Sequence, residues 1–166
     1  HGLSTMEVVG WVAKIIRDDK PDKVFLDATG MGIGIADRLQ EQGYDEVVAI
    51  NFAGKPVEPG ALDEAGRPAG GPANRRAELW SGMKAALAGR FKIPDSDSLH
   101  SDLTSLGYRY DSSGRLLIES KDDLKKRGMP SPDEADAVAL TFGQPIGAPI
   151  GRRADFWRAA IEYEGQ

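Results

Sequence analysis

The sequence has 166 residues, is 40% hydrophobic and carries a formal net charge of -5. This length supports one hydrophobic core and leaves little room for a second independent domain. Zero cysteines exclude disulfides and thiolate metal sites, and two histidines are too few for a histidine-rich metal site, so any bound metal must be held by oxygen.

The charge argues against a protein that coats nucleic acid, because phosphate neutralisation supplies most non-specific affinity. It does not exclude a nuclease, because carboxylates that hold divalent ions make a domain acidic while the ions reverse the local sign. The sequence contains no run of about 18 apolar residues and no basic-then-apolar N-terminal segment, so we expect an intracellular protein that neither crosses nor binds a membrane.

The first third of the chain predicts alternating helices and strands. Residues 4–18 form a capped amphipathic pattern, and residues 23–27 are a short apolar, β-prone run that ends at Asp27. A glycine-rich turn then leads to a predicted helix at about 33–42 and a second apolar strand at 46–52. This β-α-β order predicts parallel pairing in an α/β sheet that presents Asp27 at the tip of a buried strand.

The middle of the chain is more irregular. Residues 53–73 are rich in Gly, Pro and Ala without periodicity, which indicates an excursion from the core. A long helix is predicted at 74–88, a short strand or edge segment at 91–94, and a further capped helix at 98–106.

The last third predicts a hairpin followed by an acidic helix. Two β-prone runs around Asp-Ser-Ser-Gly favour a hairpin at 108–119, and a basic loop at 121–128 leads from it to a helix at 133–142. Residues 144–166 indicate a Gly/Pro linker and a terminal helix.

Asp27 is the first candidate site residue, because open α/β sheets place ligands at the carboxyl ends of their strands. The structural alternative is equally strong: Asp27 would only accept hydrogen bonds from the glycine turn and the following helix. The glycines at 30–34 also allow a nucleotide-phosphate site, but the spacing does not match G-x-G-x-x-G and no P-loop lysine follows.

Asp133 and Asp136 are three residues apart and therefore lie on one face of the last predicted helix. Helix capping is sufficient to explain Asp133. Asp136 lies at the margin of the apolar face of this predicted helix, where a charge needs a partner. A metal ion shared with Asp27 is one candidate for that partner. Arg75 and Arg76 begin a helix, where positive charge is unfavourable, which hints at a ligand or a partner.

Paired carboxylates around oxygen-preferring ions are what two-metal phosphodiester hydrolysis requires. The hairpin and the segment after it add cations that could bind phosphate, although each could equally be a solvated surface charge. These candidate DNA-binding residues are Arg109, Arg115, Lys121, Lys125, Lys126 and Arg127.

From about residue 3 to residue 143, the sequence resembles the nuclease domain of bacteriophage terminase large subunits, which package DNA and cut it to length. The matching motifs are the Leu-Asp-Ala-Thr-Gly-Met-Gly turn, the Asn-Arg-Arg-Ala-Glu helix start, the Glu-Ser-Lys to Lys-Arg-Gly segment, and the helix that begins Ser-Pro-Asp-Glu-Ala-Asp-Ala. They stand at residues 26–32, 74–78, 119–128 and 131–137, and the Phe-Lys-Ile-Pro segment at 91–94 and the Leu-Thr-Phe segment at 140–142 match as well.

The resemblance implies an RNase H-like mixed sheet flanked by helices, with residues 1–143 as the nuclease domain. It also implies a two-ion Mg²⁺ or Mn²⁺ site in which Asp27 is the second-strand acid, Asp136 the last-helix acid and Asp133 an auxiliary ligand. The family's first acid lies on an upstream strand that this sequence does not contain. We therefore expect an N-terminally truncated fold whose site lacks one ligand, and impaired or absent cleavage by this chain alone.

The resemblance further implies concatemeric double-stranded DNA as substrate, the terminase small subunit and portal protein as partners, and the cytoplasm of a bacterial host as location for this phage or prophage product. Two alternatives stay open. One is another RNase H-like nuclease of the resolvase or integrase type, and the other is a non-enzymatic α/β module that binds a nucleotide at the glycine turn.

Overall fold

The computed structural model describes residues 2–58, 60, 62, 64–66 and 69–145. The predicted terminal helix lies outside these residues, as does the linker apart from residues 144 and 145.

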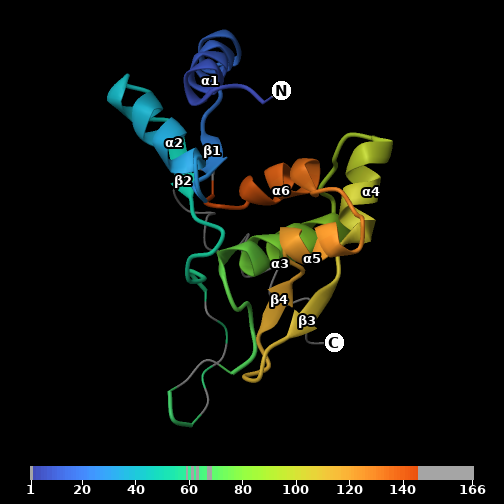
Figure 1. Cartoon of the computed structure of the whole chain (residues 1–166). Helices are drawn as coiled ribbons and strands as arrows, with labels where there is room; N and C mark the ends of the chain where they lie inside the picture. Colours follow the sequence, from blue (N-terminus) through green and yellow to red (C-terminus); the bar gives the residue numbers. More distant parts are fainter. Residues whose placement is uncertain (1, 59, 61, 63, 67–68, 146–166) are drawn as a thin grey trace.

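The N-terminal region is a two-stranded parallel sheet covered by two helices (Figure 1). Its first helix begins at a Ser4 capping box, in which the Ser4 and Glu7 side chains bind each other's backbone N–H groups. The strands pair from Val24 opposite Val47 to Asp27 opposite Ile50, so both end at the same edge. The elements are α1 (Thr5–Asp19), β1 (Val24–Asp27), α2 (Gly32–Glu41) and β2 (Val47–Ile50).

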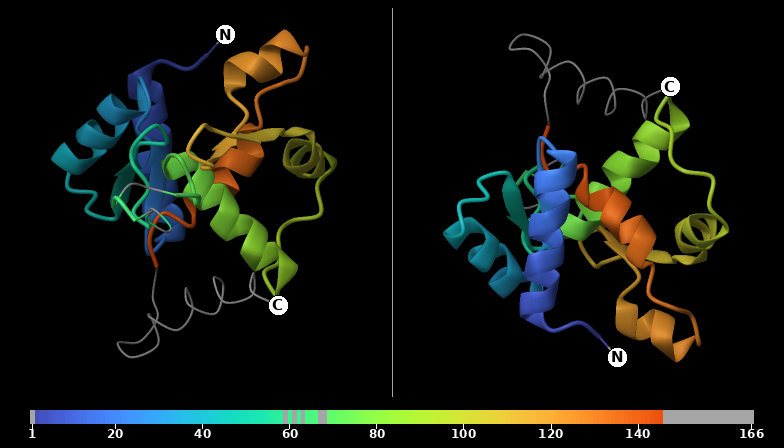
Figure 2. Two further views of the ribbon diagram at one scale, coloured as in Figure 1. Left: turned by 90° about the horizontal axis from the view of Figure 1, so that it is seen from below. Right: turned by 90° about the horizontal axis from the view of Figure 1, so that it is seen from above.

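The second region is a helical cluster with an antiparallel hairpin. Figures 1 and 2 show α6 running beside α3, and α6 also contacts α4. The elements are α3 (Arg75–Ala88), α4 (Asp97–Ser105), β3 (Tyr108–Tyr110), β4 (Leu116–Ile118), α5 (Lys121–Lys126) and α6 (Asp133–Leu140).

Strand β1 joins two hydrophobic cores because successive side chains of a strand point to opposite faces. Val24 and Leu26 pack on the core that α1 and α2 share with Val47, whereas Phe25 packs on the core built by α3, α4 and α6. Helix α6 also contacts β1 directly. The strand that ends at Asp27 therefore lies against the helix that carries Asp133 and Asp136.

The predicted β-α-β unit, the long helix, the hairpin and the acidic helix are all confirmed. Of the strand or edge segment predicted at 91–94, the strand is wrong: these residues pair with no strand among the described residues. Instead, Phe91 stacks edge-on with Phe142 at 5.3 Å between ring centroids, and Ile93 packs on the core. The predicted basic loop is helix α5, because Ser120 caps its first turn and Asp122 and Asp123 favour its N-terminus.

No helix in the described part of the chain is long and apolar enough to cross a bilayer.

Candidate functional site

Asp27 ends β1 and is held by its own turn. Its Oδ1 accepts hydrogen bonds from the backbone N–H of Thr29 at 2.9 Å and from the Thr29 hydroxyl at 2.6 Å. The carboxylate is half-buried at the strand tip, and the described contacts leave Oδ2 without a hydrogen bond. Its position at the carboxyl end of a parallel strand is the one that the sequence predicts.

The glycine turn after Asp27 has a steric explanation. A Cβ on Gly32 would lie 1.8 Å from the Asp27 carbonyl oxygen, and Gly30 adopts a φ of +66° that disfavours other residues. The tight passage from β1 into α2 therefore requires glycine at both positions. This packing accounts for part of the glycine run that also suggested a nucleotide site.

Asp136 is one of the most deeply buried charged residues in the part of the chain that the structure describes, at 5% exposure, and its main partner is Arg76 at 9% exposure. Arg76 Nε donates to Oδ1 at 3.0 Å and Nη2 donates to Oδ2 at 3.2 Å. Trp80 Nε1 donates a further hydrogen bond to Oδ1 at 2.9 Å. Since a buried charge must be paired to be tolerated, this cluster is what stabilises a carboxylate inside the α3–α6 interface.

Lys121 connects Asp136 with Asp133 at the surface. Its ammonium lies 3.0 Å from Oδ1 of Asp133 and 3.6 Å from Oδ2 of Asp136. The hydroxyl of Ser131, with Lys121, holds the pKa of Asp133 below its usual value, because both bind the charged form. Asp133 and Asp136 are therefore both paired with basic side chains of the same chain.

The start of α6 is fixed by a residue that sequence reasoning did not identify. Pro132 occupies the N-cap position and offers no side-chain hydrogen bond. Instead, Oδ2 of Asp102, from the buried side of α4, accepts from the backbone N–H groups of Glu134 at 3.0 Å and Ala135 at 3.3 Å. Asp102 thus supplies the missing cap and sets where α6 begins.

The side chains offer oxygen ligands, which suit Mg²⁺ or Mn²⁺, but their arrangement does not by itself fit a two-ion centre. Within residues 2–145, leaving aside the few not described, no three acidic or histidine side chains gather to hold an ion. Asp136 is bound by Arg76 and Trp80, and Asp133 by Lys121 and Ser131. At least one further carboxylate, and a shift of Lys121, would be needed to complete such a centre.

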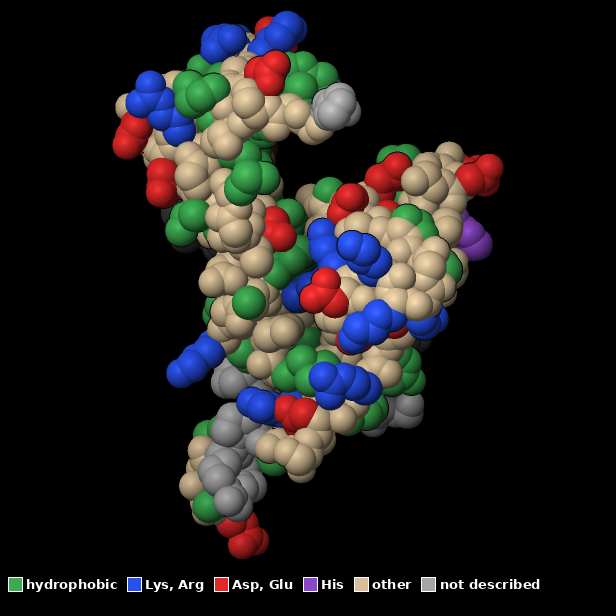
Figure 3. All heavy atoms as spheres, in the orientation of Figure 1, with side chains coloured by type: hydrophobic (Ala, Val, Ile, Leu, Met, Phe, Trp, Pro, Cys, Tyr) green, Lys and Arg blue, Asp and Glu red, His purple; other side chains and the backbone are tan. Residues whose placement is uncertain are grey.

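The six predicted DNA-binding cations lie on the hairpin and around α5 (Figure 3). Red side chains stand among the blue ones there, and the ion pairs explain why: Arg115 binds Asp111, Lys126 binds Asp123, and Arg127 binds Glu119. Lys121 is paired as described above. Of the six, Arg109 and Lys125 form no ion pair with the described residues, although Lys126 and, more weakly, the charge of Arg109 lower the pKa of Asp123.

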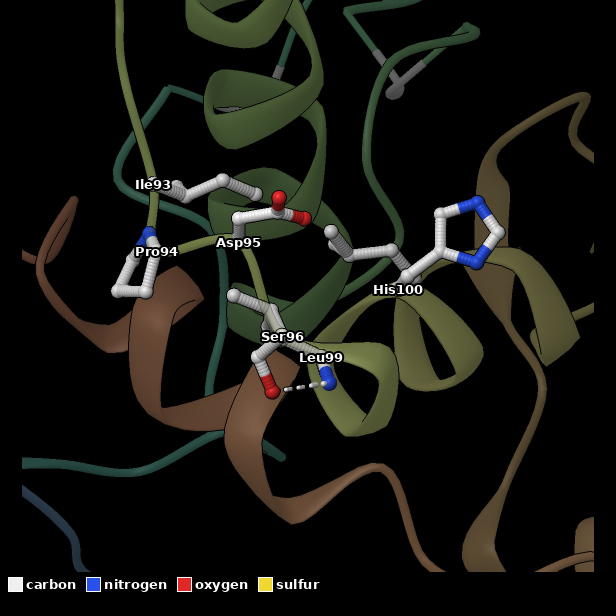
Figure 4. Close-up of a pocket in the computed structure, with 7 residues that line it drawn as sticks. Ile93, Pro94, Asp95, Ser96, Leu99 and His100 are labelled. Carbon is white, nitrogen blue, oxygen red and sulfur yellow. Dashed lines mark hydrogen bonds between the residues drawn. The ribbon is translucent and has the colours of Figure 1, made fainter.

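Two small pockets flank α4. One, of about 230 Å³, is lined by Ile93, Pro94, Leu99 and Leu103 with Asp95, Ser96 and His100. Figure 4 shows the His100 ring directed away from the other labelled side chains, and Ser96 Oγ accepting from the backbone N–H of Leu99. This pocket contains none of the acids that the sequence singles out, whereas the second, of about 330 Å³, includes Asp133 and Asp102.

The helix that carries Asp133 and Asp136 lies at the base of a hollow in the surface (Figures 1 and 3). Figure 3 shows a hollow between α1 and α4, with α6 at its base in the same orientation as Figure 1. The structure thus brings Lys121, Asp133 and Asp136 into contact, and it places the strand of Asp27 against α6. It adds Arg76, Trp80 and Asp102, which no local sequence pattern identified as part of this arrangement.

No family model matches the sequence, and no curated protein shows significant sequence similarity to it. Solved structures of similar fold are nuclease domains of the large terminase subunit gp2 of bacterial virus Sf6. A K428A mutant with manganese and beta-thujaplicinol has a TM-score of 0.64 at 20% identity, covering 84% of this chain and 72% of that one. The nuclease domain without the substitution has a TM-score of 0.62 at 20% identity, covering 82% and 71%.

A K428A mutant with manganese alone is similar to the same degree, with a TM-score of 0.62 at 20% identity. At this level of identity the comparison concerns the fold. The predicted α/β class with an RNase H-like arrangement is confirmed, and the fold of this chain is similar to that of a phage terminase nuclease domain.

Proposed function

We propose that this chain is a DNA-cutting domain that cleaves concatemeric double-stranded DNA during phage DNA packaging. The observation that carries the proposal is the meeting of β1 and α6, the two elements that bear Asp27 and Asp136, in a fold similar to a terminase nuclease domain. Position at the end of a parallel strand supports a site role for Asp27.

The proposed cofactor is Mg²⁺ or Mn²⁺. Manganese accompanies two of the similar terminase structures, and the acids here offer hard oxygen ligands. Asp27 and Asp136, with Asp133 as auxiliary, are the proposed ligands of this chain. Because they do not complete a two-ion centre, the proposal includes a further carboxylate from outside the described residues.

The proposed DNA contacts are the cations of the hairpin and α5. Arg109 and Lys125 have no ion pair to break among the described residues, whereas the other four cations would have to exchange an acidic partner for a phosphate. Lys121 is the nearest of them to Asp136, which supports a phosphate position beside that acid. The terminase small subunit and the portal protein are the proposed partners in the cytoplasm of a bacterial host.

The test is a Mn²⁺ titration of the chain together with linear plasmid DNA, measuring bound Mn²⁺ and cut DNA. Asp27→Asn should weaken Mn²⁺ binding at least about tenfold, as expected when a ligand is removed. Asp22→Asn, an exposed acid just before β1, is the matched control and should change nothing.

Asp136→Asn belongs in the same series, with its melting temperature measured alongside because its carboxylate is buried. Unaltered metal binding in both Asp27→Asn and Asp136→Asn would contradict the carboxylate site. Stabilisation by a mononucleotide without any metal would instead support a nucleotide-binding module.

A further inference from the structure

Arg76 uses all three nitrogens of its guanidinium group inside the protein. Two of them form a fork on the Asp136 carboxylate, and Nη1 donates to the backbone carbonyl of Glu119 at 2.7 Å. A planar fork on a carboxylate fixes the orientation of both groups, which a lysine ammonium cannot do. Arg76 therefore joins α3, α6 and the end of β4.

The same contacts determine which oxygen of Asp136 remains accessible. Oδ1 accepts from both Arg76 and Trp80, so its two acceptor positions are filled. Oδ2 accepts from Arg76 and has one position left, on the side where the Lys121 ammonium lies at 3.6 Å. The Arg76 guanidinium also lies 5.8 Å from the centre of the Trp80 ring, so the three groups pack as one unit.

We propose that Arg76 is a positioning residue of this site. It holds Asp136 in one orientation with Oδ2 alone available to a ligand, and it couples that carboxylate through Glu119 to the start of α5. The inference rests on the proposed function, because the orientation of Asp136 matters to DNA only if DNA binds at α5.

Arg76 and Lys121 then have different roles. Lys121 is half-exposed on the first turn of α5 and can leave Asp136 for a DNA phosphate. Arg76 is 9% exposed and cannot reach DNA, so it stays on Asp136 when Lys121 leaves. Arg76 would therefore keep the Asp136 carboxylate in place while the departure of Lys121 leaves Oδ2 open to a ligand.

The indole N–H of Trp80 reports on this carboxylate, because it donates to Oδ1. Its ¹⁵N NMR signal, assigned by its loss in Trp80→Phe, is followed while a short DNA duplex is added without divalent ions. In the unaltered chain, DNA should shift this signal as Lys121 moves to a phosphate. In Arg76→Lys, DNA affinity should stay within about threefold because the α5 cations remain, but the DNA-induced shift should be lost.

Arg75→Lys is the matched control, since Arg75 is the neighbouring arginine and pairs with Glu78 instead of Asp136. It should bind DNA and show the shift. Lys121→Gln tests the claim without altering the buried pair: the indole signal should stay sharp without DNA and no longer respond to DNA.

The inference is overturned if Arg76→Lys keeps the full shift, or if the unaltered chain binds DNA without any shift. A broadened indole signal in Lys121→Gln before DNA is added would also overturn it, because Asp136 would then depend on Lys121 for its orientation. A chain that binds no duplex at all would instead overturn the proposed function on which the inference rests.

Discussion

Asp27 and Asp136 lie in two regions of the molecule that hold an acid in opposite ways. In the N-terminal region, Asp27 is fixed by Thr29, two residues away, and remains half-buried. In the helical region, Asp136 is fixed by Arg76 and Trp80, 60 and 56 residues earlier in the chain, and is almost fully buried. One acid depends on a local turn, and the other depends on the tertiary fold.

Because of this difference, substituting Asp136 should destabilise the folded chain more than substituting Asp27. Removing the charge of Asp136 leaves the buried Arg76 guanidinium without its counter-ion. Removing the charge of Asp27 costs less, because an amide oxygen can still accept the hydrogen bonds from Thr29. Loss of function in an Asp136 variant therefore has to be separated from loss of structure, and Asp27 gives the cleaner functional test.

The largest expected effect is that of Asp136→Asn on stability. Its free energy of unfolding should fall by about 3–5 kcal/mol, because Arg76 stays buried without a carboxylate. Urea denaturation measures this, with Asp133→Asn, whose side chain is 76% exposed, as a control expected to lose less than about 1 kcal/mol. Equal stabilities of the two variants would contradict the claim that Asp136 depends on its buried pairing with Arg76.

A smaller loss is expected when the cap of α6 is removed. Asp102→Ala should lower the free energy of unfolding by about 0.5–2 kcal/mol, because two backbone N–H groups lose their acceptor. Asp102→Asn keeps an acceptor oxygen and should recover most of that loss in the same denaturation experiment. If both variants were equally destabilised, the carboxylate charge and not the cap would be the cause.

Asp27→Asn should cost less than about 1 kcal/mol, because the asparagine oxygen can still accept from Thr29. Thermal melting in the absence of metal and DNA is sufficient to measure this. A loss as large as that of Asp136→Asn would show that Asp27 is as dependent on the tertiary fold as Asp136.

The smallest effect concerns Asp133 and pH. Because its pKa is lowered in the folded chain, chiefly by Ser131, the charged form favours folding above the unfolded-state value of 3.8. This contribution is lost as pH falls below that value and through the lower folded pKa. Ser131→Ala should therefore be less stable than the unaltered chain at pH 6, by an amount that disappears in acid. A difference that grows toward acid would contradict this sign.

Local patterns were sufficient to predict β1 with Asp27 at its tip, the hairpin and α6, because caps, turns and periodicity act over a few residues. They also indicated that Asp136 needed a partner and that Arg76 was badly placed at a helix start. They could not show that these two residues are each other's partner, because the pairing depends on how α3 packs on α6. The cap from Asp102 was missed for the same reason.

The segment at 91–94 shows the opposite failure. Its residues are β-prone, but a strand requires a neighbouring strand, and here Phe91 and Ile93 pack against helices instead. The charge of the basic segment after β4 predicts a solvated loop, but the segment is helical because Ser120 and the acids that follow it stabilise a helix N-terminus. Short segments follow their tertiary neighbours more closely than their own propensity.

The central claim is that Asp27 and Asp136, from two differently built regions, serve one site. The most direct measurement is the paramagnetic line broadening that Mn²⁺ causes at the Thr29 amide and at the Trp80 indole. Both signals should broaden over the same Mn²⁺ range, and Asp27→Asn should weaken the effect at both signals while Asp22→Asn weakens it at neither. Broadening at only one of the two, or at neither, would contradict a shared site.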